Sequence, residues 1–350
     1  MNKKNVLPDT CSVREGIQIL DKESEKYVCV IDASYKLIGI FTQGDMRKYL
    51  LSNGEISAPI TQALNYNPKV FKSIEDAKAY SLKYNLVVYP IIDKDGKLQD
   101  CYIKGESTWE NLMANKPLKN IPVVIMAGGK GTRLYPYTKI LPKALIPIGD
   151  MTIAERIINQ FVEWGCNEFY FILNHKAGMI KAYFEELEKN YEIHFLEEKK
   201  FLGTGGGLSL LKGKINSTFI LSNCDVLVQA DYDCILKTHW QGKNMITFVA
   251  AMKNMVIPYG ILSTTSTGQI KEMHEKPEMS FLTNTGVYIL QPEIIDNLSP
   301  NEFIHITDIA QKYMDAGEKI GVFPVSGKSW LDMGQFEEMD VMLKELGIDG

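Results

Sequence analysis

The sequence predicts an α/β protein with a mostly parallel, doubly wound sheet, preceded by a smaller α+β module. Two observations predict this fold class. From Ile121 onward, apolar runs of strand length alternate with helical patterns, which is typical of βαβ units. Before that point the chain instead carries a weak internal repeat of short strands and helices. A chain of 350 residues has room for two or three domains, and we predict a front module of residues 1–118 and a second domain of residues 119–350.

The front module shows the same plan twice. In each copy an apolar run ends at an aspartate, Asp32 or Asp93, and a turn leads from there into a second run. Val13 in the first copy aligns with Ile74 in the second. We place the copies at about residues 1–62 and 63–118 and expect them to pack together as two related units. Residues 115–120 are polar and contain a proline, which predicts a linker to the second domain.

The second domain opens with the most informative stretch, residues 121–149, in which an apolar run leads into a loop with three glycines. Because glycine has no Cβ, the backbone N–H groups of such a loop can approach an anion closely. Arg133 and Lys143 add a planar cationic fork and a point charge. The stretch therefore predicts a polyphosphate site. It is not the dinucleotide fingerprint, because Leu134 replaces the last glycine, and it lacks the spacing of a P-loop.

This stretch resembles the signature of the sugar-1-phosphate nucleotidylyltransferases, A-G-G-x-G-T-R-L, then P-x-T, then P-K-x-L-x-P. The matching segments here are residues 127–134, 136–138 and 142–147. The resemblance implies a Rossmann-like nucleotidyltransferase fold. It also implies an in-line displacement in which a sugar 1-phosphate attacks the α-phosphorus of a nucleoside triphosphate and pyrophosphate leaves. The nucleotide-binding residues implied in this loop are Ala127, Gly128, Gly129, Gly131 and Thr132.

The same resemblance implies catalytic roles for three cationic side chains. Arg133 would hold the departing pyrophosphate, and Lys143 would contact the α-phosphate. Lys276, in a segment similar to the family's E-K-P, would fix the phosphate of the attacking sugar. Other segments resemble the family's P-x-G and N-x-G-x-Y patterns, which line the sugar pocket. The implied sugar-phosphate-binding residues are Gly260, Glu275, Lys276 and Asn284.

A second glycine loop, residues 203–207, suggests close approach of the backbone to a flat ligand. It resembles the family's L-G-T-[AG]-G loop, which implies that Gly203, Thr204 and Gly205 lie against the base and ribose. Guanine presents N–H donors on its Watson–Crick edge, so a carboxylate near this loop would suit it. Glu197 and Glu198 are the candidates, of which we choose Glu198; the alternative is that both are solvated charges.

Two distant aspartates complete the predicted site. Asp225 follows the apolar strand 219–223, and ligands of open α/β sheets bind at the carboxyl ends of strands. Asp332 is another acid in an apolar setting. An aspartate at a strand end can also be a helix cap. The resemblance implies instead that both aspartates bind one Mg²⁺ and that Asp225 also contacts the nucleotide. Mg²⁺ prefers carboxylate oxygens and keeps some of its coordination positions for phosphate oxygens.

The repeated front module resembles a pair of CBS modules. The first copy keeps that family's G-x-x-T-x-x-D as Gly39, Thr42 and Asp45, which implies that Thr42 and Asp45 hold an adenine nucleotide as a regulatory ligand. The second copy has Ile103 and Glu106 at the Thr and Asp positions, so we expect at most one such site. The alternative is structural, because a threonine at a strand end and a carboxylate in the first turn of a helix are favourable without any ligand.

The combination of both halves resembles bacterial CBS-containing glucosamine-1-phosphate guanylyltransferases. It implies GTP as the nucleotide and GDP-glucosamine, or a similar sugar nucleotide for surface glycans or nonulosonic acids, as the product. CTP, UTP and dTTP stay open as substrates, and so does a non-catalytic regulator that only binds nucleotides. A homo-oligomer is expected.

Composition excludes several other classes. The net charge of −5 predicts no bulk attraction to nucleic acid or to anionic membranes. No apolar run reaches the ~20 residues of a membrane span, and the N-terminus has no apolar signal region. The six cysteines are scattered without a C-x-x-C pair, which predicts reduced thiols in a cytoplasmic protein. The five histidines show no i, i+4 pair, so no zinc site is predicted.

Overall fold

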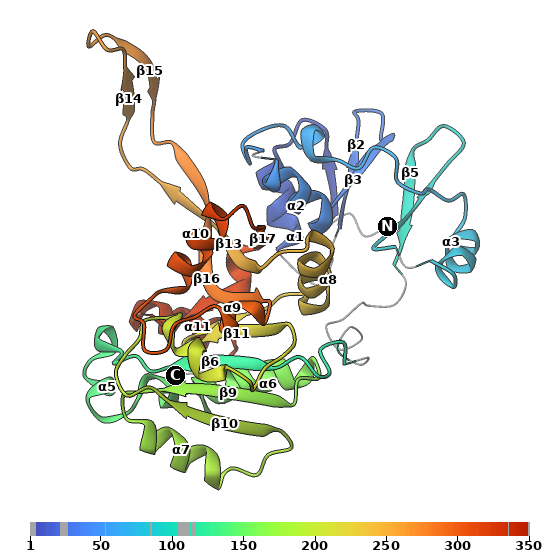
Figure 1. Ribbon diagram of the computed structural model, residues 1–350. Helices are drawn as coiled ribbons and strands as arrows, with labels where there is room; N and C mark the ends of the chain where they lie inside the picture. The colour runs from blue at the N-terminus through green and yellow to red at the C-terminus, as the bar shows by residue number, and fades with distance from the viewer. Residues whose placement is uncertain are drawn as a thin grey trace. The chain divides into compact units, whose positions relative to one another are not determined.

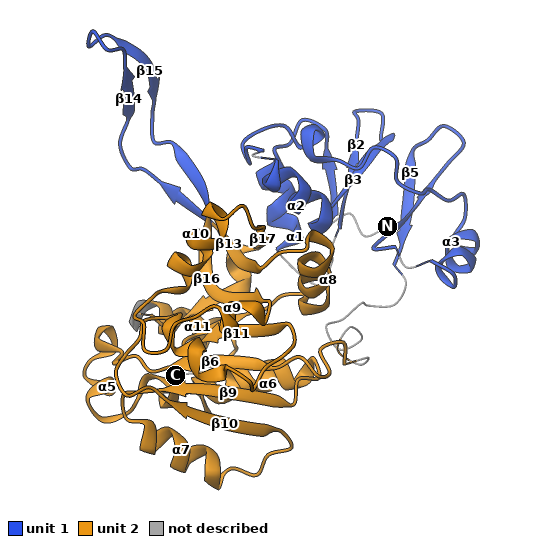
Figure 2. Cartoon of the chain, viewed as in Figure 1, with its two compact units in different colours: residues 1–111, 253–281 blue, residues 112–252, 282–350 orange. Residues whose placement is uncertain are grey.

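The computed structural model describes residues 5–21, 27–52, 54–84, 86–103, 113, 116–334 and 336–348. The chain forms two compact units, which Figure 2 shows in different colours. Residues 1–111 and 253–281 make the first unit, and residues 112–252 and 282–350 make the second. Each unit is described separately below.

The first unit contains short helices and small sheets (Figure 1). Its elements in chain order are β1 (Val6–Pro8), α1 (Val13–Leu20), β2 (Tyr27–Ile31), β3 (Leu37–Thr42), α2 (Gln43–Leu51), η2 (Ile60–Ala63), α3 (Ile74–Ser81), β4 (Tyr89–Ile92), β5 (Leu98–Tyr102), β14 (Ile261–Thr264) and β15 (Ile270–His274). Strands β1, β2 and β3 form one sheet, and β4 with β5 and β14 with β15 form antiparallel pairs.

The two copies predicted in the front module share one local structure. Each contains a helix followed by two antiparallel strands, α1-β2-β3 in the first copy and α3-β4-β5 in the second. Serines cap both helices, Ser12 for α1 and Ser73 for α3. After the first strand, Asp32 or Asp93 accepts hydrogen bonds from the backbone N–H groups two and four residues later, at 2.8 to 2.9 Å. These turns explain the repeated aspartate; the identification as a CBS pair stays a prediction.

The second unit is a mixed α/β fold around a seven-stranded sheet. Its elements are β6 (Val123–Ala127), η3 (Thr132–Leu134), α5 (Tyr137–Ile140), η4 (Lys143–Leu145), β7 (Pro147–Ile148), β8 (Met151–Thr152), α6 (Ile153–Glu163), β9 (Glu168–Leu173), α7 (Ala177–Glu186), β10 (Glu192–Glu197), η5 (Gly206–Leu211), β11 (Phe219–Asn223), β12 (Val226–Val228), α8 (Tyr232–Gly242), β13 (Ile246–Val256), β16 (Glu278–Leu290), α9 (Glu293–Asp296), α10 (Ile306–Asp315), β17 (Ile320–Val325), η6 (Gly327–Ser329), β18 (Trp330–Asp332) and α11 (Phe336–Glu345). Strands β13 and β16 continue at one end into residues of the first unit.

The strand order of the large sheet is β10-β9-β6-β11-β16-β13-β17. The pairs β10–β9, β9–β6, β6–β11 and β13–β17 are parallel, and β11–β16 is antiparallel. The predicted class was an α/β fold with a mostly parallel, doubly wound sheet, and the structure confirms a mixed α/β fold with a parallel-rich central sheet. The parallel pair β6–β11 matters most here, because its two strands end next to each other and present their carboxyl ends at one edge.

Two hydrophobic cores cover the two faces of this sheet. Neighbouring residues of β6 alternate between them: Val123 and Ile125 belong to one core, and Val124 belongs to the other. This alternation follows from the two-residue period of a strand. Helix α6 contributes Ile157 to the first core and helix α10 contributes Ile309 to the second. The sheet is thus buried on both faces, as the apolar runs in the sequence predict.

The predicted capping box at the start of α6 is confirmed. The Thr152 hydroxyl accepts the backbone N–H of Glu155 at 3.2 Å, and the Glu155 carboxylate accepts the N–H of Thr152 at 2.9 Å. In the segment predicted as a linker, Leu118 is fully buried in the core of the second unit, whereas residues 114–115 lie outside the described residues. All six cysteines are free thiols. Within the described ranges, no helix has the length and apolar character that crossing a bilayer requires.

Candidate functional site

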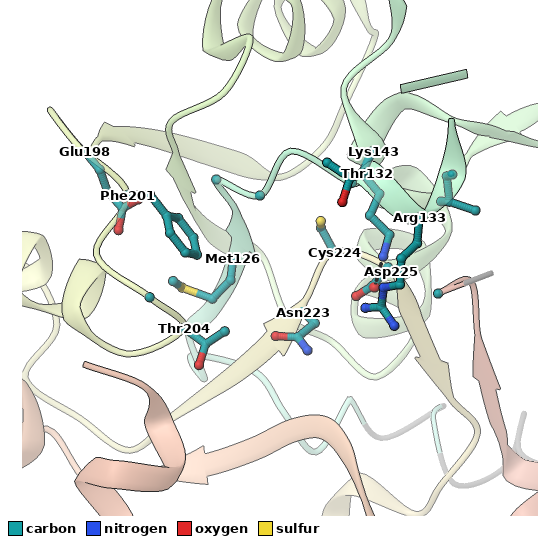
Figure 3. A pocket seen from close by; sticks show the side chains of 16 residues that line it. Met126, Thr132, Arg133, Lys143, Glu198, Phe201, Thr204, Asn223, Cys224 and Asp225 are labelled. Atoms are coloured by element: carbon teal, nitrogen blue, oxygen red, sulfur yellow. Dashed lines mark hydrogen bonds and ion pairs between the residues drawn. The ribbon is translucent and has the colours of Figure 1, made fainter. Parts of the chain in front are cut away.

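A pocket of about 290 Å³ opens where β6 and β11 end (Figure 3). The loops that follow these strands, together with the second glycine loop, supply its walls. The lining residues are Met126, Gly128, Gly129, Gly131, Thr132, Arg133, Leu134, Lys143, Glu198, Phe201, Gly203, Thr204, Asn223, Cys224, Asp225 and Gly334. The pocket lies at the carboxyl edge of the parallel strands, where open α/β sheets bind their ligands.

Figure 3 shows that the pocket has two chemically different sides. Arg133, Lys143 and Asp225 lie together on one side, and we call this the charged end. Glu198 and Phe201 lie on the other side beside the second glycine loop, and we call this the loop end. The pocket can therefore accept a ligand that is highly charged at one end and carries a flat polar group at the other.

At the charged end, the Lys143 ammonium and the Asp225 carboxylate form an ion pair. Their side chains are only 11% and 16% exposed, so the pair is screened little by solvent. The glycine loop lies against the same segment. Gly131 has a φ of +62°, and a Cβ there would lie 2.9 Å from Thr138 Cγ2 and 3.2 Å from Lys143 Cβ. Only glycine fits this backbone, which lets the loop approach the Lys143 segment.

The structure brings Asp225 and Asp332 together, although they are far apart in the sequence. Strand β12 follows Asp225 at once and pairs with β18, with Val226 opposite Asp332. The backbone N–H of Met333 donates to the carbonyl of Asp225 at 2.8 Å. Burial and the negative charges of Asp225 and Glu338 raise the pKa of Asp332 to about 6, with Lys143 acting in the opposite direction. The two aspartates thus sense each other's charge at the edge of the pocket.

The carboxylates at this end suit a hard divalent cation. A Cβ on Gly334 would lie 3.1 Å from Glu338 Oε2 and 3.2 and 3.3 Å from the two oxygens of Asp332, so these acids gather around one glycine. Among the described residues, the buried Glu338 Oε2 has no hydrogen-bond partner. Among the described residues, there is no group of three or more histidine, cysteine, aspartate or glutamate side chains that could hold a metal ion by itself. Two aspartates, with the remaining positions taken by phosphate oxygens and water, match the way Mg²⁺ is usually held.

At the loop end, Glu198 is a buried carboxylate between the two glycine loops. Glu198 is only 6% exposed. Among the described residues, neither of its carboxylate oxygens has a hydrogen-bond partner of standard geometry. A Cβ on Gly128 would lie 3.1 Å from Oε2, and one on Gly207 would lie 2.5 Å from Oε1. The missing side chain at Gly207 leaves room for this carboxylate, and the contact at Gly128 would be tight. Burial raises the pKa of Glu198 to about 7, and the nearby backbone N–H of Leu202 has a weaker, opposite effect.

An unpaired carboxylate at Glu198 should lower stability in a pH-dependent way. Its folded-state pKa of about 7 lies above the ordinary value of 4.5, so the folded protein binds a proton that the unfolded chain releases. Stability therefore falls as the pH rises between these two values. We expect Glu198→Gln to leave the free energy of unfolding nearly unchanged at pH 4 and to raise it by roughly 1–3 kcal/mol at pH 8. Urea unfolding of the unmodified protein and of Glu198→Gln between pH 4 and pH 8 measures this difference in the free energy of unfolding. Equal free energies of unfolding at pH 8 would contradict the expectation.

The pocket gathers most residues predicted to bind the nucleotide. Those that line it are Gly128, Gly129, Gly131, Thr132, Glu198, Gly203, Thr204 and Asp225, together with the predicted catalytic residues Arg133 and Lys143. Ala127 and Gly205 are direct chain neighbours of lining residues. The functional roles of these residues stay predictions, but their positions are compatible with one bound ligand.

The predicted sugar-phosphate residues are not gathered in the same way. Gly260, Glu275 and Lys276 lie in residues 253–281, which belong to the first unit, so their part in the site stays a prediction. Gly260 and Glu275 do lie close together there, since a Cβ on Gly260 would be 2.8 Å from Glu275 Oε2. Asn284 lies on β16 in the second unit, and its side-chain amide donates to the Tyr288 hydroxyl at 2.8 Å.

The predicted regulatory residues of the front module form a capping box. Thr42 is the N-cap of α2; its hydroxyl donates to the Asp45 carboxylate at 2.6 Å and accepts the N–H of Asp45 at 3.3 Å. This is the structural alternative stated for the motif, and a nucleotide ligand stays a prediction. Glu106 of the second copy lies outside the described residues.

Sequence reasoning missed several lining residues, namely Met126, Leu134, Phe201, Asn223, Cys224 and Gly334. Asn223 and Cys224 directly precede Asp225 at the end of β11, so the strand-end rule that selected Asp225 could have selected them too. Phe201 precedes the second glycine loop, where an aromatic residue that is 45% exposed is a usable signal for a ligand surface. Gly334 had no signal of its own.

The fold and the pocket define this chain as a mixed α/β protein with a pocket at the carboxyl edge of its central sheet. A family profile described as nucleotidyl transferase matches residues 122–344. The chain therefore belongs to the nucleotidyl transferase family, and the predicted family is confirmed at this level.

Curated relatives carry related names. A bifunctional protein GlmU from Methanococcus maripaludis is 31% identical over 220 residues, which cover 60% of this chain and 51% of the relative. A UTP–glucose-1-phosphate uridylyltransferase from Synechocystis is 28% identical over 232 residues, 61% of this chain and 60% of the relative. A mannose-1-phosphate guanyltransferase from Pichia angusta is 30% identical over 227 residues, with the same coverage of 61% and 60%. The chain thus spans about half or somewhat more of the length of these relatives.

Solved structures share the fold. HddC from Yersinia pseudotuberculosis has a TM-score of 0.52 and 24% identity, and the match covers 65% of this chain and 99% of HddC. A second structure of HddC, in complex with GMP-PN, matches with a TM-score of 0.52 and 23% identity. At this level of identity the likeness concerns the fold alone.

Proposed function

We propose that this chain transfers a nucleoside monophosphate, with GTP as the favoured donor, to a sugar 1-phosphate, giving a nucleotide sugar and pyrophosphate. One observation carries the proposal: a single pocket joins the Lys143–Asp225 pair at one end to the unpaired Glu198 carboxylate at the other. Asp332 does not line this pocket, but its strand pairs with the residues that follow Asp225. A nucleoside triphosphate has the matching shape, with phosphates at one end and a base at the other. The names of the curated relatives support a sugar phosphate as the acceptor.

The charged end can perform the transfer by positioning and charge neutralisation. The attacking oxygen of a sugar phosphate is already ionised at neutral pH, so no general base is needed. We assign Arg133 to the departing pyrophosphate, Lys143 to the α-phosphate and Lys276 to the attacking phosphate. Lys143 already faces the pocket through its pair with Asp225, and a phosphate oxygen beside that pair would share its ammonium. When bound by Asp225 and Asp332, Mg²⁺ would neutralise charge on the phosphate oxygens.

We assign the loop end to guanine in preference to the pyrimidine bases. Guanine carries two adjacent donors on its Watson–Crick edge, N1–H and N2–H, and both can be accepted by the two oxygens of Glu198. Uracil and thymine have one N–H flanked by two carbonyl oxygens, which a carboxylate repels, and cytosine has only one donor group there. Discrimination by repulsion of the wrong base is a common basis of specificity. HddC, which shares the fold, has been solved with GMP-PN, and this agrees with the assignment.

Several finer assignments belong to the same proposal. We propose glucosamine 1-phosphate or a similar hexosamine or heptose 1-phosphate as the acceptor, an adenine nucleotide at Thr42 and Asp45 of the front module, and a homo-oligomeric enzyme. A non-catalytic regulator is the second candidate. The joint presence of Arg133, Lys143 and both aspartates argues against it, because a protein that only binds nucleotides does not need a complete set of charges for transfer.

Pyrophosphate release tests the proposal. The purified chain is incubated with Mg²⁺, one of GTP, ATP, CTP, UTP or dTTP, and a panel of hexosamine and heptose 1-phosphates. We expect pyrophosphate only when a sugar 1-phosphate is present, with the highest kcat/KM for GTP. Binding of nucleotides without release for any combination would support the regulator instead. Release that is fastest with a pyrimidine nucleotide would overturn the guanine assignment and keep the reaction class.

A further inference from the structure

Three consecutive residues after β9 contact two segments that line the pocket and a third segment that leads to Lys143. Asn174 Nδ2 donates to the carbonyl of Glu198 at 2.9 Å, on the segment that forms the loop end. The backbone N–H of His175 donates to the carbonyl of Gly128 in the first glycine loop, at 3.4 Å. Lys176 contacts the segment that leads to Lys143. Among the residues that the structure describes, these three are not part of the pocket lining.

Lys176 makes the strongest of these contacts. Its ammonium donates to the backbone carbonyls of Thr138, Lys139 and Ile140 at 3.0, 2.7 and 2.8 Å. A lysine ammonium has three N–H donors, so its hydrogen-bonding capacity is filled. These carbonyls end helix α5, and the last carbonyls of a helix have no partners within it. Lys176 also adopts a φ of +56°, which is unfavourable for a residue other than glycine, so the surrounding contacts must offset a strained backbone.

The segment that Lys176 holds connects the two cations of the charged end. Helix α5 lies between Arg133 and Lys143 in the chain, and η4 begins at Lys143. On its other side α5 is tied to the glycine loop, because the Thr138 hydroxyl donates to the carbonyl of Gly131 at 2.7 Å. The segment is therefore fixed at two points, the glycine loop and Lys176. Lys143 follows three residues after Ile140, the last residue whose carbonyl accepts a hydrogen bond from Lys176.

We propose that Lys176 is a positioning residue for Lys143. By holding the end of α5, its ammonium sets the place where η4 begins and so directs Lys143 toward Asp225 and the pocket. Lys176 touches no reacting group, and its effect on turnover, which rests on the proposed function, passes through Lys143. Positioning of this kind is costly to lose, because a displacement of about 1 Å at a reacting centre can reduce the rate by roughly 100-fold.

The first test does not depend on any activity. Hydrogen exchange is measured in the ligand-free protein for the amides of Leu141 and Leu145, which donate to the carbonyls of Tyr137 and Pro142 at 3.0 and 2.9 Å. We expect Lys176→Met to speed the exchange of both by about 10-fold or more. Lys189→Met is the matched control, because Lys189 donates to the carbonyls of Phe184 and Leu187 at the other end of α7. Unchanged exchange at Leu141 and Leu145 in Lys176→Met would overturn the proposal.

The second test separates positioning from general destabilisation. We expect Lys176→Met to lower kcat by roughly 10- to 100-fold, with a smaller change in the KM for GTP, and Lys176→Arg to recover part of the loss. In a protein that already carries Lys143→Met, adding Lys176→Met should lower kcat by no more than about 2-fold, because both act through one side chain. Lys189→Met should leave kcat unchanged.

Two results would contradict this account. If Lys176→Met lowers kcat by the same factor in the unmodified protein and in the Lys143→Met variant, Lys176 acts through a residue other than Lys143. Equal losses of kcat in Lys176→Met and Lys189→Met would show a general loss of stability. If the unmodified protein shows no transfer with any substrate, the proposed function fails, and the exchange measurement alone still decides whether Lys176 holds the Lys143 segment.

Discussion

Asp225→Asn is expected to lower kcat by roughly 100- to 1,000-fold, the scale of losing one preorganised electrostatic group in an active site. The asparagine keeps the size of the side chain but removes the negative charge that faces both Lys143 and Asp332. A neutral amide is a poorer ligand for Mg²⁺ than a carboxylate, so the variant should also need a higher Mg²⁺ concentration for its remaining activity. Steady-state rates across a Mg²⁺ titration measure both effects.

The fold should survive this change, because Asp225 lies at a strand end and its backbone contacts remain. Asp231→Asn is the matched control. Asp231 caps helix α8 by accepting the N–H of Cys234 at 2.9 Å, and asparagine is an equally good N-cap. Circular dichroism and thermal unfolding should be similar for both variants, with activity lost only in Asp225→Asn. Near-normal turnover in Asp225→Asn would show that the metal assignment is wrong.

Glu198→Gln is expected to remove the preference for GTP. Hydrogen bonds to a charged acceptor contribute about 1.5–3 kcal/mol, so kcat/KM for GTP should fall roughly 10- to 100-fold. The values for UTP and CTP should change little or increase, because the glutamine amide can donate to the carbonyl oxygens that the carboxylate repels. Measuring kcat/KM for four nucleoside triphosphates in the wild-type protein and the variant tests the expectation.

Glu197→Gln is the control for this experiment. Glu197 is the neighbouring residue, its side chain is 54% exposed, and it forms an ion pair with Lys181. Its replacement should leave the ranking of the nucleotides unchanged. An equal loss for all four nucleotides in Glu198→Gln would mean that Glu198 supports the pocket without reading the base.

Local sequence patterns were sufficient to predict the main elements of the second unit. The capping box of α6, with Thr152 and Glu155, is a short-range signal that needs no tertiary information. The parallel sheet followed from apolar runs that alternate with helices, since such runs must be buried on both faces. The antiparallel neighbour β16 was not predicted, because strand order depends on contacts between distant parts of the chain.

The site was predictable only in part for the same reason. Strand ends and glycine loops identify Asp225, Gly128 and Gly131 directly. The proximity of Asp332 to Asp225 came from the family resemblance, and its structural cause is the pairing of β12 with β18. No sequence pattern indicates Lys176, because its three partners are backbone carbonyls, and every residue type offers the same carbonyl.

The most direct measurement follows the labelled α-phosphate of GTP. The purified chain is incubated with α-³²P-labelled GTP, Mg²⁺ and glucosamine 1-phosphate or a related sugar phosphate, and the products are separated. The account predicts that label appears in a GDP-sugar in the unmodified protein, and that this product is nearly absent in Asp225→Asn, in Asp332→Asn or after removal of Mg²⁺ by a chelator. Label that stays in GTP for every sugar phosphate, or transfer that is unaffected by loss of both aspartates, would contradict it.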